Sequence, residues 1–387
     1  MGYQVVGTWR QVLHWGPLIA LSVIFTISIM TVKCGLMWWP PTQSWGGALN
    51  MTVFLTWVLL TLFNYFNAMF RGPGFVPLEW KPSNDAAKYL QFCDFCNGCK
   101  APRSHHCRKC DRCVMKMDHH CPWINTCCGH FNHGFFVWFL LFAPCGCIHA
   151  LCILIPSIYR AVNFHYYYRL PNEPLVYLSV PAFVLTMFSV GLAIGVVIAV
   201  GMLFYMQIKS VLKNETAIES WIIDKALDRE RSDDEGPFIY PYHLGWRRNL
   251  KEVFTRTGKP RSDGFVWPVV EGCNQYTLTL EQLYQKMEKR ERTIQCVVVE
   301  SYSGQLFPCT KGCKVACCVP CTDEPRITLT PGDRVLVTRW KKHWLYGTKM
   351  LSPKERQEKC RIRGWFPRKC VKEIVDDNDN VNEKKDA

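Results

Sequence analysis

The stretch "CDFCNGCKAPRSHHCRKCDRCVMKMDHHCPWINTCC", residues 93–128, holds nine of the chain's 22 cysteines. These cysteines form overlapping CxxC pairs, and four histidines lie among them. A CxxC turn presents two thiolates to one ion, and tetrahedral zinc takes Cys and His ligands at such spacings. Because the stretch has few large apolar side chains, we expect metal binding to supply much of its folding energy. Spacing alone does not decide which residues share an ion.

The chain's 387 residues also contain four long apolar runs, at 17–39, 48–70, 135–159 and 178–206. At 1.5 Å rise per residue, each run is long enough to cross roughly 30 Å of hydrocarbon as a helix. The first run is longer than a signal-peptide core and is followed by "MWWPP", so we expect it to stay in the mature protein. The sequence therefore predicts a polytopic α-helical membrane protein with four transmembrane helices.

The loops predict the orientation of these spans. Residues 38–50 contain no charged residue, whereas residues 71–134 carry nine lysines or arginines. The positive-inside rule places the second of these loops, and with it both termini, in the cytoplasm. The net charge of +14 then lies mostly on cytoplasmic parts, where anionic headgroups and phosphate ligands are the expected counterparts. We expect no nucleic acid partner, since no basic stripe interleaved with aromatic residues appears.

A cytoplasmic location favours metal over disulfides, because the cytosol is reducing. A ubiquitin-ligase type of metal site is excluded by spacing, since no gap of RING length separates the cysteine pairs. The segment "RSHHCRKCDRCVMKMDHHCPWINTC", residues 103–127, together with the preceding CxxC, instead resembles the DHHC family of zinc-finger protein S-acyltransferases, or palmitoyltransferases.

The resemblance implies two interleaved structural zinc sites in a cytoplasmic cysteine-rich domain at 93–134. Cys99 and Cys128 would be spare thiols, and a shifted pairing with Cys99 in place of Cys93 stays open. The implied ligands are Cys93, Cys96, His106 and Cys113 in one site, and Cys107, Cys110, His120 and Cys127 in the other.

The catalytic residues are expected in "DHHC" itself, at 118–121. In an extended segment His119 and Cys121 share one face while His120 points the other way, so His119 is available as a base for the Cys121 thiolate. The resemblance implies that Asp118 orients His119, as in a triad. Cys121 would take the acyl group of palmitoyl-CoA and pass it to cysteines of target proteins near the membrane. The alternatives for Cys121 are a further zinc ligand or a packing thiol.

A palmitoyl chain stays in the bilayer, because burying it contributes roughly 10 kcal/mol. The resemblance places Trp123, Phe136 and Phe139 on that chain, although ordinary helix packing explains the two phenylalanines equally well. CoA is polyanionic, so we expect basic side chains beside the zinc sites to bind it. The alternative is that these side chains form an ordinary charged surface in contact with solvent. The expected CoA contacts are Lys100, Arg103 and His105.

After the fourth run, residues 216–219 occupy the place of the family's TTxE motif. Ala217 stands where the second threonine would be, and in the family that hydroxyl supports the catalytic aspartate. We therefore expect Asp118 to have one hydrogen-bond donor fewer. The acyltransferase region as a whole is expected to span residues 1–262.

Residues 275–374 resemble an all-β SH3 domain, with alternating strands, a turn at Gly332-Asp333 and "GWFP" before the final strand. His343 replaces the ligand-stacking tryptophan of that family, so an adaptor or intramolecular partner is favoured over proline-rich peptides.

The run "CTKGCKVACCVPC", at 309–321, is interpreted as a site of acylation, with a metal site or inert thiols as alternatives. The candidates for acylation are Cys317, Cys318 and Cys321.

The tail at 375–387 ends in "EKKDA", where Lys384 and Lys385 form a dilysine retrieval signal. This address predicts the endoplasmic reticulum membrane. The alternative to an acyltransferase is a non-catalytic, zinc-folded membrane adaptor that recruits partners through the SH3-like domain.

Overall fold

The computed structural model describes residues 9–231, 235–322, 324–351 and 362–374. The chain divides into two compact units, residues 1–281 and 282–387, which are described separately. The dilysine signal lies outside the described residues.

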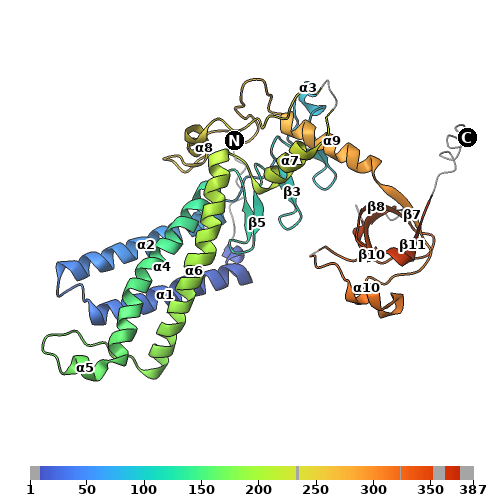
Figure 1. The fold of residues 1–387 in the computed structure, drawn as a ribbon. Helices are drawn as coiled ribbons and strands as arrows, with labels where there is room; N and C mark the ends of the chain where they lie inside the picture. The colour runs from blue at the N-terminus through green and yellow to red at the C-terminus, as the bar shows by residue number, and fades with distance from the viewer. Residues whose placement is uncertain (1–8, 232–234, 323, 352–361, 375–387) are drawn as a thin grey trace, which may run out of the picture. The chain divides into compact units, whose positions relative to one another are not determined.

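Four long helices form the first unit: α1 (Trp15–Trp38), α2 (Trp45–Phe70), α4 (His133–Val162) and α6 (Val180–Lys213). All four are long and apolar enough to cross a membrane, which confirms the four predicted spans. Figure 1 shows α4 and α6 running side by side, with α1 and α2 beside them. α6 extends past the predicted end of the fourth run to Lys213, and it ends at Asn214 in the left-handed region (φ 54°).

Three small antiparallel hairpins make up the cysteine-rich region between α2 and α4. The first pairs β1 (Phe92–Cys93) with β2 (Gly98–Cys99). The second pairs β3 (His105–Cys107) with β4 (Arg112–Val114), and the third pairs β5 (His119–Cys121) with β6 (Thr126–Cys128). The extended conformation expected of His119 to Cys121 is therefore confirmed, and Asp118 lies just before this strand.

Shorter elements complete this unit: η1 (Trp9–Gln11), α3 (Asn84–Ala87), α5 (Phe164–Tyr168), α7 (Ala217–Asp228), α8 (Trp246–Val253) and the start of α9 (Thr277–Glu291). α7 begins in a full capping box, because Thr216 accepts from the Glu219 amide and Glu219 accepts from the Thr216 amide. This cap fixes the start of α7, which lies against the cysteine-rich region.

The second unit is built on one antiparallel sheet with the strand order β10-β9-β8-β7-β11. Its strands are β7 (Ile294–Val298), β8 (Arg334–Trp340), β9 (Trp344–Lys349), β10 (Ile362–Pro367) and β11 (Val371–Glu373). The turn η3 (Arg368–Cys370) joins the last two strands, while η2 (Cys309–Lys311) and α10 (Cys313–Cys317) lie in the long connection before β8. Trp344 and Phe366 are among the fully buried residues of its core.

Candidate functional site

The three hairpins repeat one another along the chain. Cys93, Cys107 and Cys121 each end the first strand of a hairpin, and they are equally spaced in the sequence. Each hairpin turns through a left-handed residue at the matching place: Asn97 (φ 50°), Asp111 (φ 51°) and Asn125 (φ 47°). Asn and Asp tolerate this conformation better than other non-glycine residues, so the sequence itself favours these turns.

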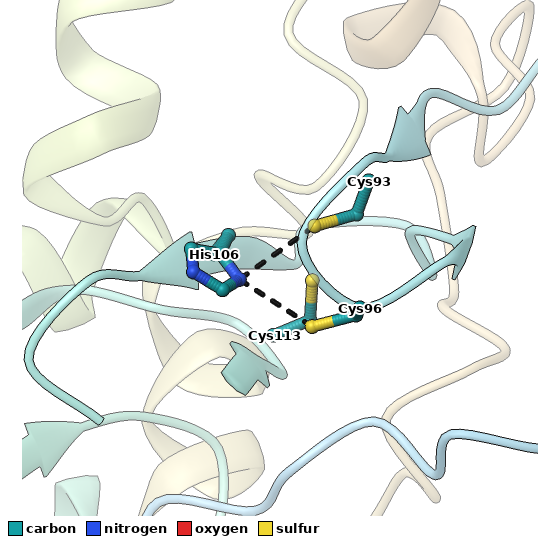
Figure 2. A group of neighbouring side chains, drawn as sticks. All are labelled: Cys93, Cys96, His106 and Cys113. Carbon is teal, nitrogen blue, oxygen red and sulfur yellow. Dashed lines mark hydrogen bonds between the residues drawn. The ribbon is translucent and has the colours of Figure 1, made fainter. Parts of the chain in front are cut away.

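The first candidate metal centre joins the first two hairpins, as Figure 2 shows, and consists of Cys93, Cys96, His106 and Cys113. The Sγ atoms of Cys93 and Cys96 lie 3.6 and 3.4 Å from Nδ1 of His106. A tetrahedral zinc with bonds of about 2.3 Å to sulfur and 2.0 Å to nitrogen separates those atoms by about 3.5 Å. The four side chains therefore fit zinc.

The second candidate centre repeats this arrangement one hairpin further on, with Cys107, Cys110, His120 and Cys127. Nδ1 of His120 lies 3.6, 3.4 and 3.7 Å from the three sulfur atoms of Cys107, Cys110 and Cys127. Both groupings coincide with the ligand sets implied by the resemblance. Among the described residues, Cys99 belongs to neither group, so the geometry disfavours the shifted pairing.

Cys121 also lies outside both groups, although it holds the same hairpin position as Cys93 and Cys107. In the third hairpin Ile124 occupies the place of the second cysteine of the pair and is fully buried. After this hairpin the chain continues into α4 rather than into a further hairpin. The third hairpin therefore has neither the second thiolate nor the two ligands of a following hairpin.

The side chains of Asp118 and His119 are in direct contact, with Oδ2 of the carboxylate 2.7 Å from Nδ1 of the imidazole. Burial raises the pKa of Asp118, but hydrogen bonding to His119 outweighs it and holds this pKa well below its usual range. Burial lowers the pKa of His119, but hydrogen bonds to Asp118 and Cys121 raise it to about 10. Asp118, His119 and Cys121 thus form a connected set in which the imidazole favours its charged form.

Two more donors hold the Asp118 carboxylate. Nε2 of Gln207 donates to Oδ2 at 2.9 Å, and the backbone amide of Ala217 donates to Oδ1 at 2.8 Å. Oε1 of Gln207 in turn lies 2.8 Å from Nε2 of His133 at the start of α4. Ala217 has no hydroxyl to donate to Asp118, as expected. Its backbone amide and the Gln207 side chain of α6 donate instead.

Gln207 and His133 were not among the predicted site residues. A signal for Gln207 was present, because a polar side chain near the end of an apolar span usually serves a purpose. The amide of Ala217 had no signal, since any residue other than proline carries one.

The segment after Cys121 is held by α1 and α2. The Tyr65 hydroxyl donates to the carbonyl of Trp123 at 2.8 Å, and a Cβ on Gly16 would lie 2.0 Å from the carbonyl oxygen of Pro122. Only glycine permits this approach of α1. The proposed reactive cysteine is therefore fixed against the membrane helices.

Cys121 itself packs into an apolar cluster with side chains of α2 and α4, including Tyr65, Phe136 and Phe139. Phe136 also meets the ring of His119 edge to face, with centroids 5.4 Å apart. Trp123 is different, because 43% of its surface is exposed and its ring packs on Trp15.

Cys128 is a poorer candidate for chemistry than Cys121, although it lies opposite His119 in the hairpin. It is fully buried, and burial raises its pKa well above the ordinary value. It therefore stays a protonated packing thiol.

Arg103 is buried, although it was expected among the CoA contacts. Its guanidinium is completely buried and forms a two-pronged ion pair with Glu219, at 2.7 Å for both contacts. It also donates to the carbonyl of Asn214 at 2.7 Å. These contacts contradict the expectation that Arg103 binds CoA, because its donors are used inside the protein. The pair instead ties the cysteine-rich region to α7.

Lys116 completes this buried network, with Nζ donating to Oδ1 of Asn214 at 2.9 Å. Burial, together with the positive charge of Arg103, lowers the pKa of Lys116 to about 7. By contrast, the other two expected CoA contacts, Lys100 and His105, are half-buried.

In the second unit, the cysteines at 309, 313, 317, 318 and 321 are all exposed. Val315 is buried between them and accepts a hydrogen bond from Nε1 of Trp344 at 3.1 Å. Among the described residues, no metal-ligand group includes these cysteines. This segment is therefore anchored through Val315 and presents its thiols outward.

Comparison with known proteins agrees with this geometry. The sequence signature of the DHHC palmitoyltransferase family matches residues 86–224. The chain is 49% identical to palmitoyltransferase ZDHHC6 of Danio rerio over 97% of this chain and 95% of that protein. It is also 49% identical to palmitoyltransferase ZDHHC6 of Homo sapiens, over 94% of this chain and 91% of that protein. A probable protein S-acyltransferase of Arabidopsis thaliana is 30% identical over 60% of this chain and 82% of its own.

These relatives and the four apolar helices make the chain a multi-pass membrane protein, and its activity is that of a protein S-palmitoyltransferase. The chain belongs to the DHHC palmitoyltransferase family.

Proposed function

We propose that Cys121 is the nucleophile that carries the palmitoyl group, with His119 as its base and Asp118 as the residue that orients His119. The observation that carries this proposal is the contact of 2.7 Å between Asp118 and His119 beside a cysteine that belongs to neither ligand group. The raised pKa of His119 favours an imidazolium, which stabilises a neighbouring thiolate.

The reaction then has two balanced steps. In the first, the Cys121 thiolate attacks the thioester carbonyl of palmitoyl-CoA, the carbon–sulfur bond to CoA breaks, and His119 gives its proton to the departing CoA thiolate. In the second, neutral His119 takes the proton of a target cysteine, whose sulfur attacks the acyl-enzyme and releases the Cys121 thiolate. The resting imidazolium and thiolate are thereby restored.

We propose that each of the two Cys3His groups holds one structural zinc ion. Zinc would supply folding energy to three hairpins that lack a large apolar core of their own. In this proposal the second centre also positions the catalytic residues. Its ligand His120 lies on one face of β5, so His119 and Cys121 lie on the opposite face.

We propose that the palmitoyl chain passes Phe136 and Phe139 and enters the helix bundle, with Trp123 at the entrance. Support comes from the shared cluster of Cys121 with these phenylalanines and from a cavity of about 50 Å³ deeper between the helices. Apolar side chains line this cavity, among them Ile27, Phe54, Val58 and Ala143. For the CoA headgroup we propose Lys100 and His105 alone.

We propose that residues 275–374 contain an SH3-like domain and that it binds a partner protein. The sheet order β10-β9-β8-β7-β11, the long connection before β8 and the 3-10 turn before β11 support an SH3-like topology. The exposure of Cys317, Cys318 and Cys321 supports their acylation, which would hold this domain at the bilayer.

We further propose an endoplasmic reticulum location with both termini in the cytoplasm, on the basis of loop charges and the dilysine tail.

The test uses the full chain purified in detergent and incubated with palmitoyl-CoA. We expect a hydroxylamine-sensitive thioester on Cys121, located by mass spectrometry, and its loss in Cys121→Ser. A non-catalytic adaptor would form no thioester at this position. A label that persists in Cys121→Ser at another cysteine of residues 93–128 would move the nucleophile there.

A further inference from the structure

A groove of about 310 Å³ lies between α2, α4 and the segment 253–258, which begins at the last residue of α8. Its long walls come from α2 and α4, and two of their side chains in the groove, Phe63 and Trp138, are exposed on the outside of the bundle. Figure 1 shows α8 at the end of α6 that lies opposite α5. None of the residues that line this groove also lines the cavity between the helices. It is therefore separate from the proposed path of the palmitoyl chain.

The roof of the groove, residues 253–258, is held tightly in place. A Cβ on Gly134 would lie 2.8 Å from the carbonyl oxygen of Val253, and a Cβ on Gly258 would lie 2.5 Å from the Phe135 ring. Gly258 also has a positive φ of 65°, which glycine adopts without strain. Between these points Phe254 packs on Trp138, with ring centroids 5.1 Å apart. The groove is thus a feature of the fold rather than a gap beside a loose loop.

Two arginines are among the residues that line the groove. Arg71 follows the last residue of α2, where it donates to Oδ1 of Asn67 at 3.0 Å and lies 4.5 Å over the ring of Phe135. Arg256 is exposed and lines the same groove from the roof. Thr255 and Thr257 add hydroxyl groups, and none of the described lining residues is acidic. The groove therefore combines two cationic side chains with apolar walls.

We propose that this groove binds one anionic phospholipid of the surrounding membrane. The phosphate would lie between Arg71 and Arg256, because a guanidinium group can donate two parallel hydrogen bonds to phosphate oxygens. An acyl chain would follow Phe63 and Trp138 along the outer face of the bundle. A free phosphate ion would use the two cations but not the apolar walls, so the combination favours a lipid. Basic groups at the ends of membrane helices attract anionic headgroups in the same way.

The test uses the full chain in nanodiscs of phosphatidylcholine with a minor fraction of phosphatidylinositol, followed by native mass spectrometry of the released protein. We expect the wild type to retain one phosphatidylinositol in preference to phosphatidylcholine. Arg256→Gln should lower this preference about fivefold and Arg71→Gln by a similar factor, as expected for one basic group each. Arg256 is exposed, so its substitution should not disturb folding.

Arg247→Gln is the matched control, since Arg247 is an exposed arginine of α8 that does not line the groove. Its lipid preference should equal that of the wild type. Equal retention of both lipids by the wild type would overturn the proposal, as would an unchanged preference in Arg256→Gln or an equal loss in Arg247→Gln. Displacement of the lipid by added inorganic phosphate would assign the arginines to a free anion and would also overturn it.

Discussion

The second and third hairpins of the cysteine-rich region share a backbone but differ in what their first cysteine does. β3–β4 and β5–β6 have strands of equal length and turn through left-handed residues at matching places. Cys107 lies in a ligand group with Cys110, whereas Cys121, at the same place in the third hairpin, packs against side chains of the membrane helices. A repeated hairpin turn thus supplies both a candidate metal ligand and the proposed nucleophile.

The difference arises from one side chain and from the element that comes after each hairpin. Ile124 replaces the second thiolate and packs into the same apolar cluster as Cys121. The second hairpin is followed by a third, which contributes His120 and Cys127, but the third is followed by α4. A thiolate needs three further ligands to become part of a tetrahedral zinc site. The end of the repeat at α4 therefore leaves Cys121 outside both ligand groups.

The largest expected effect is the removal of a ligand from the second hairpin. Cys110→Ser should reduce the zinc content from two ions to one and lower the free energy of unfolding, since a structural zinc contributes about 10 kcal/mol. Cys121→Ser is the matched change in the third hairpin and should keep both ions. Metal analysis and thermal unfolding of the two variants measure this contrast. Loss of an ion from Cys121→Ser would make Cys121 a ligand.

Ile124→Cys should make the third hairpin resemble the second. The new thiolate would lie beside Cys121 in a CxxC turn, so added zinc should bind both and nearly abolish transfer, while a mild chelator should restore it. Ile124→Val is the control, because it removes part of the Ile124 packing without adding a thiol and costs about 1 kcal/mol in stability. The transfer activity of this variant should not change when zinc is added. Activity of Ile124→Cys that is unchanged by zinc would show that the second thiolate alone, without ligands from a following hairpin, does not bind an ion at this place.

Much of the comparison could be predicted from the sequence, because cysteine spacing and strand alternation are local properties. The four spans follow from run length, and the two ligand groups agree with the family resemblance. The face shared by His119 and Cys121 follows from the period of a strand. Contacts between distant segments could not be predicted in this way.

Arg103 and Gln207 illustrate that limit. The expectation for Arg103 treated a basic residue beside the zinc ligands as a surface group, yet Glu219 of α7 pairs with it in the interior. Gln207 lies on the fourth long helix, and only the packing of α6 against the third hairpin brings it to Asp118. The local pattern marks Gln207 as a polar residue at the end of a span, but it does not identify the partner of either residue.

Asp118→Asn tests whether the third hairpin is catalytic. The amide keeps the size of the side chain but removes the charge that stabilises the imidazolium, so acyl-enzyme formation should slow by about 10²- to 10⁴-fold. Single-turnover labelling with palmitoyl-CoA measures this rate. The zinc content should stay at two ions, because Asp118 belongs to neither ligand group. A labelling rate within about twofold of the wild type would remove Asp118 from the mechanism.

Gln207→Leu tests the link from the third hairpin to α6. The Asp118 carboxylate would lose one of its donors but keep His119 and the Ala217 amide, so labelling should slow by about tenfold. Its pH profile should shift as well, since the donor lies on the oxygen that contacts His119. An effect on stability alone, with an unchanged profile at neutral and acid pH, would make Gln207 a packing residue.

Ala217→Pro removes the backbone amide that donates to Asp118, while His119 and Gln207 stay in place. We expect this substitution to disturb the fold very little. Ala217 is the first residue of α7, where proline is favoured because its missing amide has no partner within the helix. Thr216 is already extended (φ −99°, ψ 163°), as a residue before proline must be. The lost hydrogen bond is to Oδ1, the oxygen away from His119, so we expect a reduction of about fivefold in labelling. Ala217→Gly keeps the amide and should label at the wild-type rate. If the proline and glycine variants slowed equally, the side chain or helix α7 would matter rather than the hydrogen bond, and the third hairpin would not depend on this backbone donor.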